Sequence, residues 1–274
     1  MSEFLKFLLP GAVSVALLLS PVGAAMAQSA EEITANGGCP DCRLTRADLR
    51  SLKIKNANFS GARMIEADLK NASLPTADFS DASLHRAELE KANLYGTNFT
   101  DAIMRASDLE KSELTAANLA HADLRDADLA NAFIAGTSFE EADLRHALLR
   151  RSEGAGANFS RALMDHVDLE RAELPDGNFN RARLTGADLD RANLEGGDFQ
   201  DADLSKAHLS STDLSGASFS GTDFSDALLR RTRFLGADLS DADGLEQDQL
   251  DMACGDSNTK LPRGMTISTC GAAD

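Results

Sequence analysis

The stretch GADLDRANLEGGDFQDADLSKAHL, residues 186–209, repeats one pattern every five residues. Its large apolar residues fall at the same place in each repeat: Leu189, Leu194, Phe199, Leu204 and Leu209. A small residue lies two positions before each of them. Side chains alternate with a period of two in a β-strand and 3.6 in an α-helix. A period of five therefore indicates a different, turn-rich unit.

The same frame runs without a slip from Leu44 to Leu239, as forty consecutive pentapeptides. The central residue is mostly Leu or Phe, and the residue two places before it is mostly Ala. Self-similarity at a short fixed period is typical of solenoids. An unbroken frame leaves no room for a second globular domain, so residues 44–243 are predicted to form a single solenoid.

A longer period shows how the repeats close into coils. Phenylalanine recurs every twenty residues, with one interruption at Leu119: Phe59, Phe79, Phe99, Phe139, Phe159, Phe179, Phe199 and Phe219. If each pentapeptide forms one side and one corner, twenty residues return the chain to the same side. Pro75 and Pro175 fall at corner positions, and glycines such as Gly196 follow where a type II turn needs a positive φ. We predict a square parallel β-helix of about ten coils, stacked at one strand spacing into a rod of about 48 Å.

Repeats such as EADLK, RANLE and DADLS resemble those of the pentapeptide-repeat proteins. That family forms a right-handed quadrilateral β-helix, so the resemblance implies an all-β fold that agrees with the twenty-residue period. The resemblance covers residues 44–243. It specifies the fold much more closely than the function, because one fold serves many roles.

The two ends of a solenoid expose apolar rungs and need caps. Residues 28–43 are expected to cover the first coil, and residues 244–274 to form a capping helix and a tail. The segment GLEQDQLDMAC is typical of a short helix, with Asp243 as its N-cap and Gly255 just past its end. Its apolar residues would close the last coil: Leu245, Leu250 and Ala253.

The N-terminus is typical of an export signal. Residues 1–27 combine an early lysine, an apolar run and the small-residue site Ala25-Met26-Ala27. We expect cleavage before Gln28, a periplasmic or secreted protein, and no stable membrane insertion after cleavage. The alternative is an uncleaved anchor, because residues 7–27 carry no charge.

Four cysteines flank the repeats: Cys39, Cys42, Cys254 and Cys270. An even number in an exported protein favours disulfides, and we expect one within each end. A redox-active CxxC at Cys39 and Cys42 and a four-cysteine zinc site remain as alternatives. The zinc site would require the two ends of a long rod to meet.

The net charge of −17 excludes a general nucleic-acid binder and suits a basic protein partner. In a coil of twenty residues, one outward column carries a run of carboxylates: Asp48, Asp68, Glu88, Asp108 and Asp128. These five residues, called the acidic column below, are a candidate binding surface. The alternative is that Asp before the central residue is simply the consensus of the repeat.

Three apolar residues stand where the repeat is normally polar, within two coils of Gly154: Phe133, Leu148 and Leu163. Exposed apolar groups of this kind indicate a partner surface or a homodimer contact. Gly154 itself replaces a core residue, which predicts either a notch or a gap closed by its neighbours. His146 and His166 share a column with Asp126 and are weak candidates for Zn²⁺ or Cu²⁺.

The sequence contains no Ser/His/Asp or Cys/His set and no phosphate-binding glycine loop. We expect a non-enzymatic periplasmic scaffold that needs no cofactor and binds a macromolecular partner through the charged faces of a rigid rod. The resemblance implies an alternative, since some family members mimic DNA and act on DNA gyrase. An export signal argues against that role.

Overall fold

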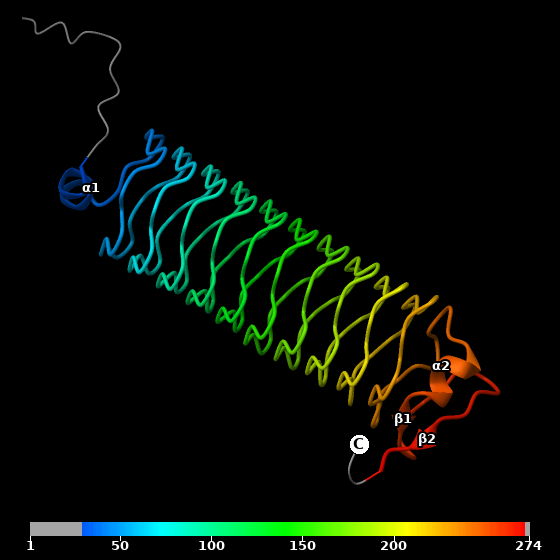
Figure 1. Ribbon diagram of the computed structural model, residues 1–274. Coiled ribbons are helices and arrows are strands. Elements are labelled where there is room, and N and C mark those ends of the chain that lie inside the picture. Colours follow the sequence, from blue (N-terminus) through cyan, green and yellow to red (C-terminus); the bar gives the residue numbers. More distant parts are fainter. Residues whose placement is uncertain (1–28, 272–274) are drawn as a thin grey trace, which may run out of the picture.

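A computed structural model describes residues 29–271 as a rod of stacked coils (Figure 1). Parallel bridges join each outward residue to the residue twenty positions later, from Gly38 and Asn58 to Asp223 and Asp243. This confirms the twenty-residue coil. Among residues 29–271, regular strand is limited to β1 (Cys254–Gly255) and β2 (Ser268–Thr269), because each side of a coil is too short to give more than single bridges.

Each pentapeptide makes one side and one corner of a coil. At Phe159, the central side chain is fully buried and its carbonyl accepts a hydrogen bond from the N–H of Ala162 at 3.0 Å. Between them, Arg161 adopts the positive φ of a type II turn, 57°. The inward alanine leaves space for the central side chain, so both inward positions contribute to one continuous core.

The phenylalanines stack along the inside of the rod as the twenty-residue period predicts. Ring centroids are 4.9 Å apart between Phe139 and Phe159 and 5.0 Å apart between Phe159 and Phe179. The stack is interrupted at Leu119, which is also fully buried. Such offset aromatic pairs contribute about 0.5–1.5 kcal/mol each beyond the area that they bury.

The N-terminal end is closed by a helix that the repeat pattern did not predict. Helix α1 (Ala30–Asn36) begins with a capping box between Ser29 and Glu32 and buries Ile33 completely against the core. A disulfide joins Cys39 to Cys42. The parallel ladder begins at Gly38, ahead of the first pentapeptide, so the coil extends into the segment expected to be a cap.

The C-terminal helix is shorter than expected. Helix α2 (Gln247–Asp251) has Glu246 rather than Asp243 as its N-cap, because Asp243 still bridges to Asp223. Gly255 lies in β1 instead of ending the helix. The buried Gln249 amide donates to the carbonyls of Phe224 at 3.0 Å and Ala227 at 2.9 Å. It thereby satisfies backbone acceptors that the last coil would otherwise leave unpaired.

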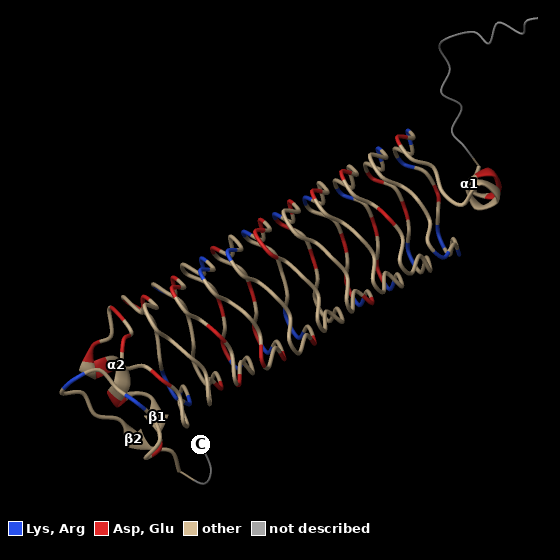
Figure 2. Cartoon of the chain, turned by 180° about the vertical axis from the view of Figure 1, so that it is seen from behind, with Lys and Arg blue, Asp and Glu red and all other residues tan. Residues whose placement is uncertain are grey.

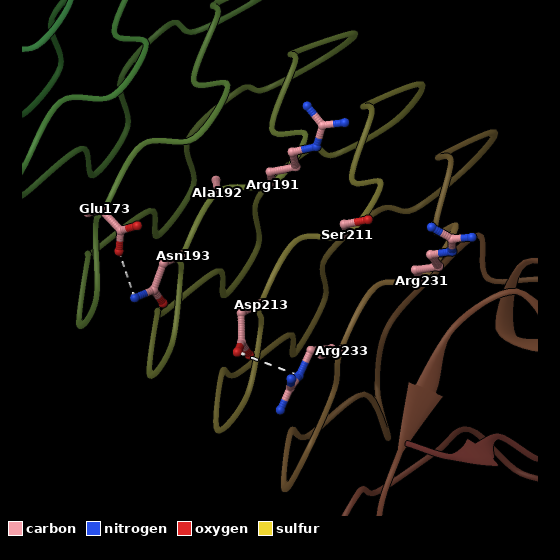
Figure 3. A pocket seen from close by; sticks show the side chains of 8 residues that line it. All are labelled: Glu173, Arg191, Ala192, Asn193, Ser211, Asp213, Arg231 and Arg233. Atoms are coloured by element: carbon pink, nitrogen blue, oxygen red, sulfur yellow. Dashed lines mark hydrogen bonds and ion pairs between the residues drawn. The ribbon is translucent and has the colours of Figure 1, made fainter. Parts of the chain in front are cut away.

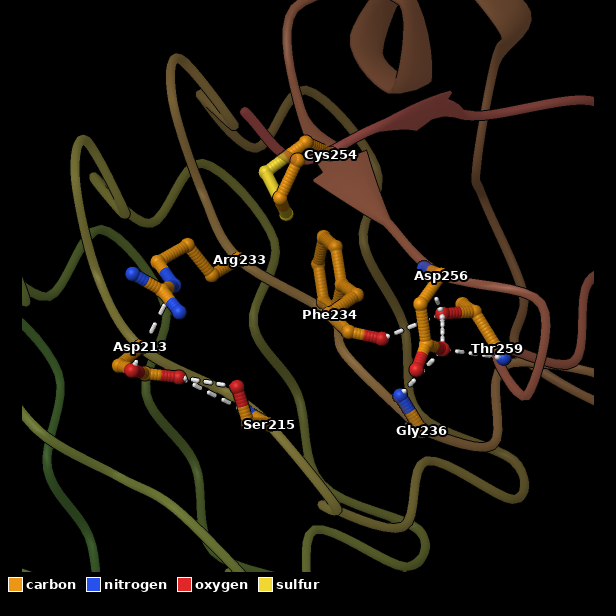
Figure 4. Close-up of a disulfide and its surroundings, with 9 residues drawn as sticks. Asp213, Ser215, Arg233, Phe234, Gly236, Cys254, Asp256 and Thr259 are labelled. Atoms are coloured by element: carbon orange, nitrogen blue, oxygen red, sulfur yellow. Dashed lines mark hydrogen bonds and ion pairs between the residues drawn. A yellow bond between two sulfur atoms is a disulfide. The ribbon is translucent and has the colours of Figure 1, made fainter. Parts of the chain in front are cut away.

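After α2, the chain returns along the end of the rod. Cys254 bridges to Arg233 and is disulfide-bonded to Cys270, while β1 and β2 pair in parallel (Figure 4). Leu245, Leu250 and Ala253 are buried, as expected of a cap. The structure therefore confirms one disulfide within each end, and the two ends lie at opposite extremes of the rod (Figure 1).

Gly154 leaves no open void in the core. A Cβ placed on it would lie 2.6 Å from Cγ1 of Ile134 and 2.7 Å from Cδ2 of Leu174. The side chains of the coils above and below have therefore filled the missing rung.

Within residues 29–271, no helix is long and apolar enough to cross a membrane. The predicted signal, residues 1–27, lies outside the described residues.

Candidate partner-binding surface

The acidic column exists as one continuous row, because successive members bridge to one another from Asp48 to Asp128. Its carboxylates also serve the fold. The side chains of Asp108 and Asp128 accept the backbone N–H two residues later, at 3.0 and 2.9 Å. This is an Asx-turn contact, which stabilises the corner that follows. The consensus interpretation of these aspartates therefore has a physical basis.

The charge of the acidic column is neutralised unevenly. Arg50 pairs with Asp48 at 2.6 Å, and Lys70 pairs with Glu88 at 2.7 Å. The Arg50 contact lowers the pKa of Asp48 to about 2. Asp108 and Asp128, by contrast, form no ion pair within residues 29–271. The unneutralised part of the column is thus its C-terminal part, in the middle of the rod.

Asp108 shows the electrostatic consequence. Burial raises the pKa of its carboxyl, and the charges of Asp128, Glu90 and Glu110 raise it further. Lys111 compensates only partly, because its ammonium pairs with Glu110 at 2.6 Å. Acidic and basic residues are interleaved along the rod (Figure 2). A cationic group of a partner would therefore relieve repulsion at Asp108 and Asp128.

Phe133, Leu148 and Leu163 do not form one patch. Phe133 bridges to Glu113 and Glu153, Leu148 to Asp128 and Asp168, and Leu163 to Asp143 and Arg183, so they stand in three different columns. Phe133 and Leu148 are exposed, by 42% and 36%, and Leu163 is half-buried. The expectation of a single apolar surface was wrong, because a step of fifteen residues in a coil of twenty moves each residue to a neighbouring side of the square, so no two of the three share a face.

Sequence analysis missed a second acidic column, on the face of Phe133. Glu113, Glu153 and Glu173 bridge in series with Phe133, and none of them forms an ion pair within the described chain. They surround a shallow groove of about 370 Å³ beside Gly154. The twenty-residue period could have revealed this column, since it places the four residues in one row.

A polar groove of about 660 Å³ lies nearer the C-terminal end (Figure 3). Asn193 donates to Glu173 at 3.0 Å, and Arg233 pairs with Asp213 at 3.7 Å. Arg191, Ser211 and Arg231 also line the groove and present donors that could hold an oxyanion. The guanidinium group of Arg191 also pairs with the carboxylate of Glu170, outside the groove, at 3.5 Å. Two carboxylates and three guanidinium groups line this groove, so the groove as a whole carries little net charge.

His146 and His166 stack with their ring centroids 5.3 Å apart. The adjacent carboxylate of Asp165 is held by Arg183 at 2.6 Å and is not available as a metal ligand. No group of three or more His, Cys, Asp or Glu side chains suited to a metal ion occurs among residues 29–271. Two imidazoles alone fall short of the three or four ligands typical of a zinc site.

The solved structures similar to this chain include pentapeptide-repeat proteins. HetL of the cyanobacterium Nostoc sp., involved in heterocyst differentiation regulation, is 27% identical over 76% of this chain and 97% of its own, with a TM-score of 0.44. QnrB1, a plasmid-mediated fluoroquinolone resistance protein, is 17% identical over 69% of this chain and 91% of its own, with a TM-score of 0.40. Rfr23 of Cyanothece is 24% identical over 42% of this chain and 63% of its own, with a TM-score of 0.31.

No curated protein matches the chain significantly. Two family models do match. The model described as "Pentapeptide repeat region" matches residues 82–159. The model described as "Pentapeptide repeats (8 copies)" matches residues 42–81, 155–191, 187–226 and 207–243. The matches together extend over nearly the whole rod, and the chain belongs to the pentapeptide-repeat family.

Proposed function

We propose that this protein is a non-enzymatic scaffold of the periplasm, a rod of about ten coils that binds a protein partner through its acidic middle section. One observation supports this above all: Asp108 and Asp128 stand adjacent in a column and form no ion pair within residues 29–271, while Asp48 and Glu88 in the same column are each paired with a cation. Unpaired surface charge of one sign raises the association rate of a partner of opposite charge. The partner is therefore expected to be basic.

The experiment is affinity capture with crosslinking from periplasmic extract. The test variant carries Asp→Asn or Glu→Gln at the five residues of the acidic column. These changes keep a side-chain oxygen that can accept the backbone N–H of the turn, so the fold is retained while the charge is lost. A matched control neutralises five carboxylates of another face: Asp123, Asp143, Asp203, Asp223 and Asp243. A partner captured by wild type and control but lost from the test variant supports the proposal; equal capture by all three contradicts it.

The alternative is a DNA mimic that acts on a DNA-binding protein such as gyrase. The observation in its favour is the stacking of carboxylates at one-coil intervals along a rod of net charge −17. The Arg50 and Lys70 pairs and the apolar Leu148 interrupt this resemblance to a phosphate backbone. A supercoiling assay with purified gyrase distinguishes the two functions, because only the mimic would alter the enzyme's activity.

A further inference from the structure

The groove beside Gly154 is a local departure from the repeat. Its floor is formed by Gly154, Ala135 and Ala155, and it ends at Thr115 and Pro175. In the same corner column as the two alanines, other coils carry larger side chains, such as Tyr95 and Glu195. The side of the rod is therefore hollowed where the small residues succeed one another.

Phe133 forms an apolar wall of this groove. Its column otherwise carries polar residues in the neighbouring coils, including Asn93, Glu113 and Glu153. Its side chain remains 42% exposed, although the same chain buries ten other phenylalanines completely. An aromatic ring at the edge of a small hollow is typical of a pocket that accepts one apolar side chain.

Glutamates stand on both sides of Phe133 along the rod. Glu113 lies one coil before it, and Glu153 and Glu173 lie one and two coils after it. Glu113 accepts a hydrogen bond from the N–H of Thr115 at 2.9 Å, and Glu173 accepts one from Asn193 at 3.0 Å. Glu153 is exposed and has no side-chain partner among the described residues. None of the three glutamates forms an ion pair within residues 29–271, although Arg191 lines the next groove beside Glu173.

We propose that this groove binds a basic segment of another protein, which inserts one apolar side chain beside Phe133 and places Lys or Arg against Glu113, Glu153 and Glu173. The inference rests on the proposed function as a scaffold and names the chemistry of the partner at one site. A second copy of this chain fits poorly, because a surface of net charge −17 would repel itself. Contact between the partner's apolar side chain and Phe133 provides most of the affinity. The pairs between the partner's Lys or Arg and the three glutamates fix the position of the segment along the groove.

The probe is a pool of fluorescein-labelled eight-residue peptides, each with one central Leu, Phe or Trp flanked on both sides by Lys and Arg. Binding to the purified exported protein is measured by fluorescence anisotropy at low salt and at 0.15 M salt. A control pool replaces Lys and Arg with Glu. We expect the basic pool to bind and the acidic pool not to bind.

Two variants test the groove directly. Ala155→Tyr fills it with the residue that stands at the equivalent position in another coil, Tyr95, and Phe133→Ser removes its wall. Each should weaken binding at least tenfold. Glu153→Gln with Glu173→Gln should weaken binding and flatten its salt dependence. The matched control is Leu148→Ser, which removes an exposed apolar residue from another face and should leave binding unchanged.

Circular dichroism spectra of all variants must match that of the wild type. The proposal is overturned if no peptide binds at millimolar concentration, or if Ala155→Tyr binds as tightly as the wild type. It is also overturned if Asp108→Asn with Asp128→Asn abolishes binding as effectively as Phe133→Ser, since binding would then be non-specific attraction to acid. A captured partner that depends on the acidic column but not on Ala155 would leave the proposed function intact and refute only this site.

Discussion

Replacement of Gly154 by alanine tests whether the missing core rung has been filled. Gly→Ala at an unstrained position stabilises a protein by about 0.4–1 kcal/mol through the unfolded state. Here the new Cβ would lie 2.6 Å from Cγ1 of Ile134 and 2.7 Å from Cδ2 of Leu174. Carbon atoms prefer about 3.5–4.0 Å, and overpacking of this kind costs about 1–3 kcal/mol. We therefore expect Gly154→Ala to destabilise the protein by about 1 kcal/mol.

Guanidinium unfolding followed by far-UV circular dichroism measures the change, provided that the slope of the transition is unaltered. A double-mutant cycle identifies the cause. Leu174→Ala removes one of the two colliding atoms, so the penalty of Gly154→Ala should fall by at least about 0.5 kcal/mol in that background. Gly136→Ala is the control, because nothing lies within 4 Å of its Cβ and its φ of 60° makes its cost one of backbone strain alone.

The opposite sign would refute this account. If the core contained an open void at Gly154, the added methyl group would fill it and Gly154→Ala would stabilise the protein. Strict additivity with Leu174→Ala would also contradict the proposed collision. In either case the groove outside Gly154 would need another explanation, because the wall of the rod would not be packed as tightly as described.

Three further predictions concern charge, disulfides and metal. Burial raises the pKa of Asp108 in the folded protein above its usual 3.8, so the ionised carboxylate destabilises the fold. This destabilisation is present above the folded-state pKa and disappears as the pH falls through that pKa. Asp108→Asn should therefore raise Tm at pH 7 and lose this advantage near pH 4. Replacing Cys254 and Cys270 with Ser should cost about 3 kcal/mol in loop-closure entropy, against about 2 kcal/mol for the shorter loop of Cys39 and Cys42, as measured by thermal melts with and without reductant. Added Zn²⁺ should shift Tm equally in the wild type and in the His146→Ala, His166→Ala variant; a shift confined to the wild type would establish a metal site.

The sequence was sufficient to predict the coil, because a square solenoid makes residue n the neighbour of residue n + 20. That rule placed the phenylalanine stack and the acidic column, and the cysteine positions indicated one disulfide within each end. The same rule would have separated Phe133 from Leu148 if it had been applied to them. Helix α1 was missed although Ser29 and Glu32 have the spacing of a capping box.

The repeat predicted ion pairs between neighbouring columns, such as Lys111 with Glu110, but not the pairing of each carboxylate in the acidic column. Arg50 reaches both Asp48 at 2.6 Å and Asp68 at 3.5 Å, a choice that depends on side-chain rotamers and not on position in the frame. The column alone therefore suggested five equivalent carboxylates, whereas the structure divides them into neutralised and unneutralised groups. The hollow beside Gly154 was indicated only in part: Gly154 predicted a notch or a closed gap, and the succession of Ala135 and Ala155 at the twenty-residue period could have located the hollow.

The turn chemistry of the repeat explains why part of its acidity is structural. Corner residues such as Arg191 adopt a positive φ of 61°, a backbone conformation that raises the free energy of any residue other than glycine. The backbone N–H of Arg191 donates to Ser210 at 3.0 Å, and Asp188 accepts the N–H of Asp190 at 3.0 Å. Together these bonds hold the corner in place, so an aspartate before the central residue stabilises the coil whether or not anything binds to it.

Departures from this consensus are therefore more informative than the consensus itself. Leu148 and Phe133 occupy the position from which Asp or Asn accepts the turn N–H, and neither side chain can accept a hydrogen bond. Each substitution gives up a contact that stabilises the corner and exposes an apolar group to water. At Phe133 the exposed ring also borders a groove between unneutralised glutamates. That combination is what the proposed docking of a basic segment with one apolar side chain requires.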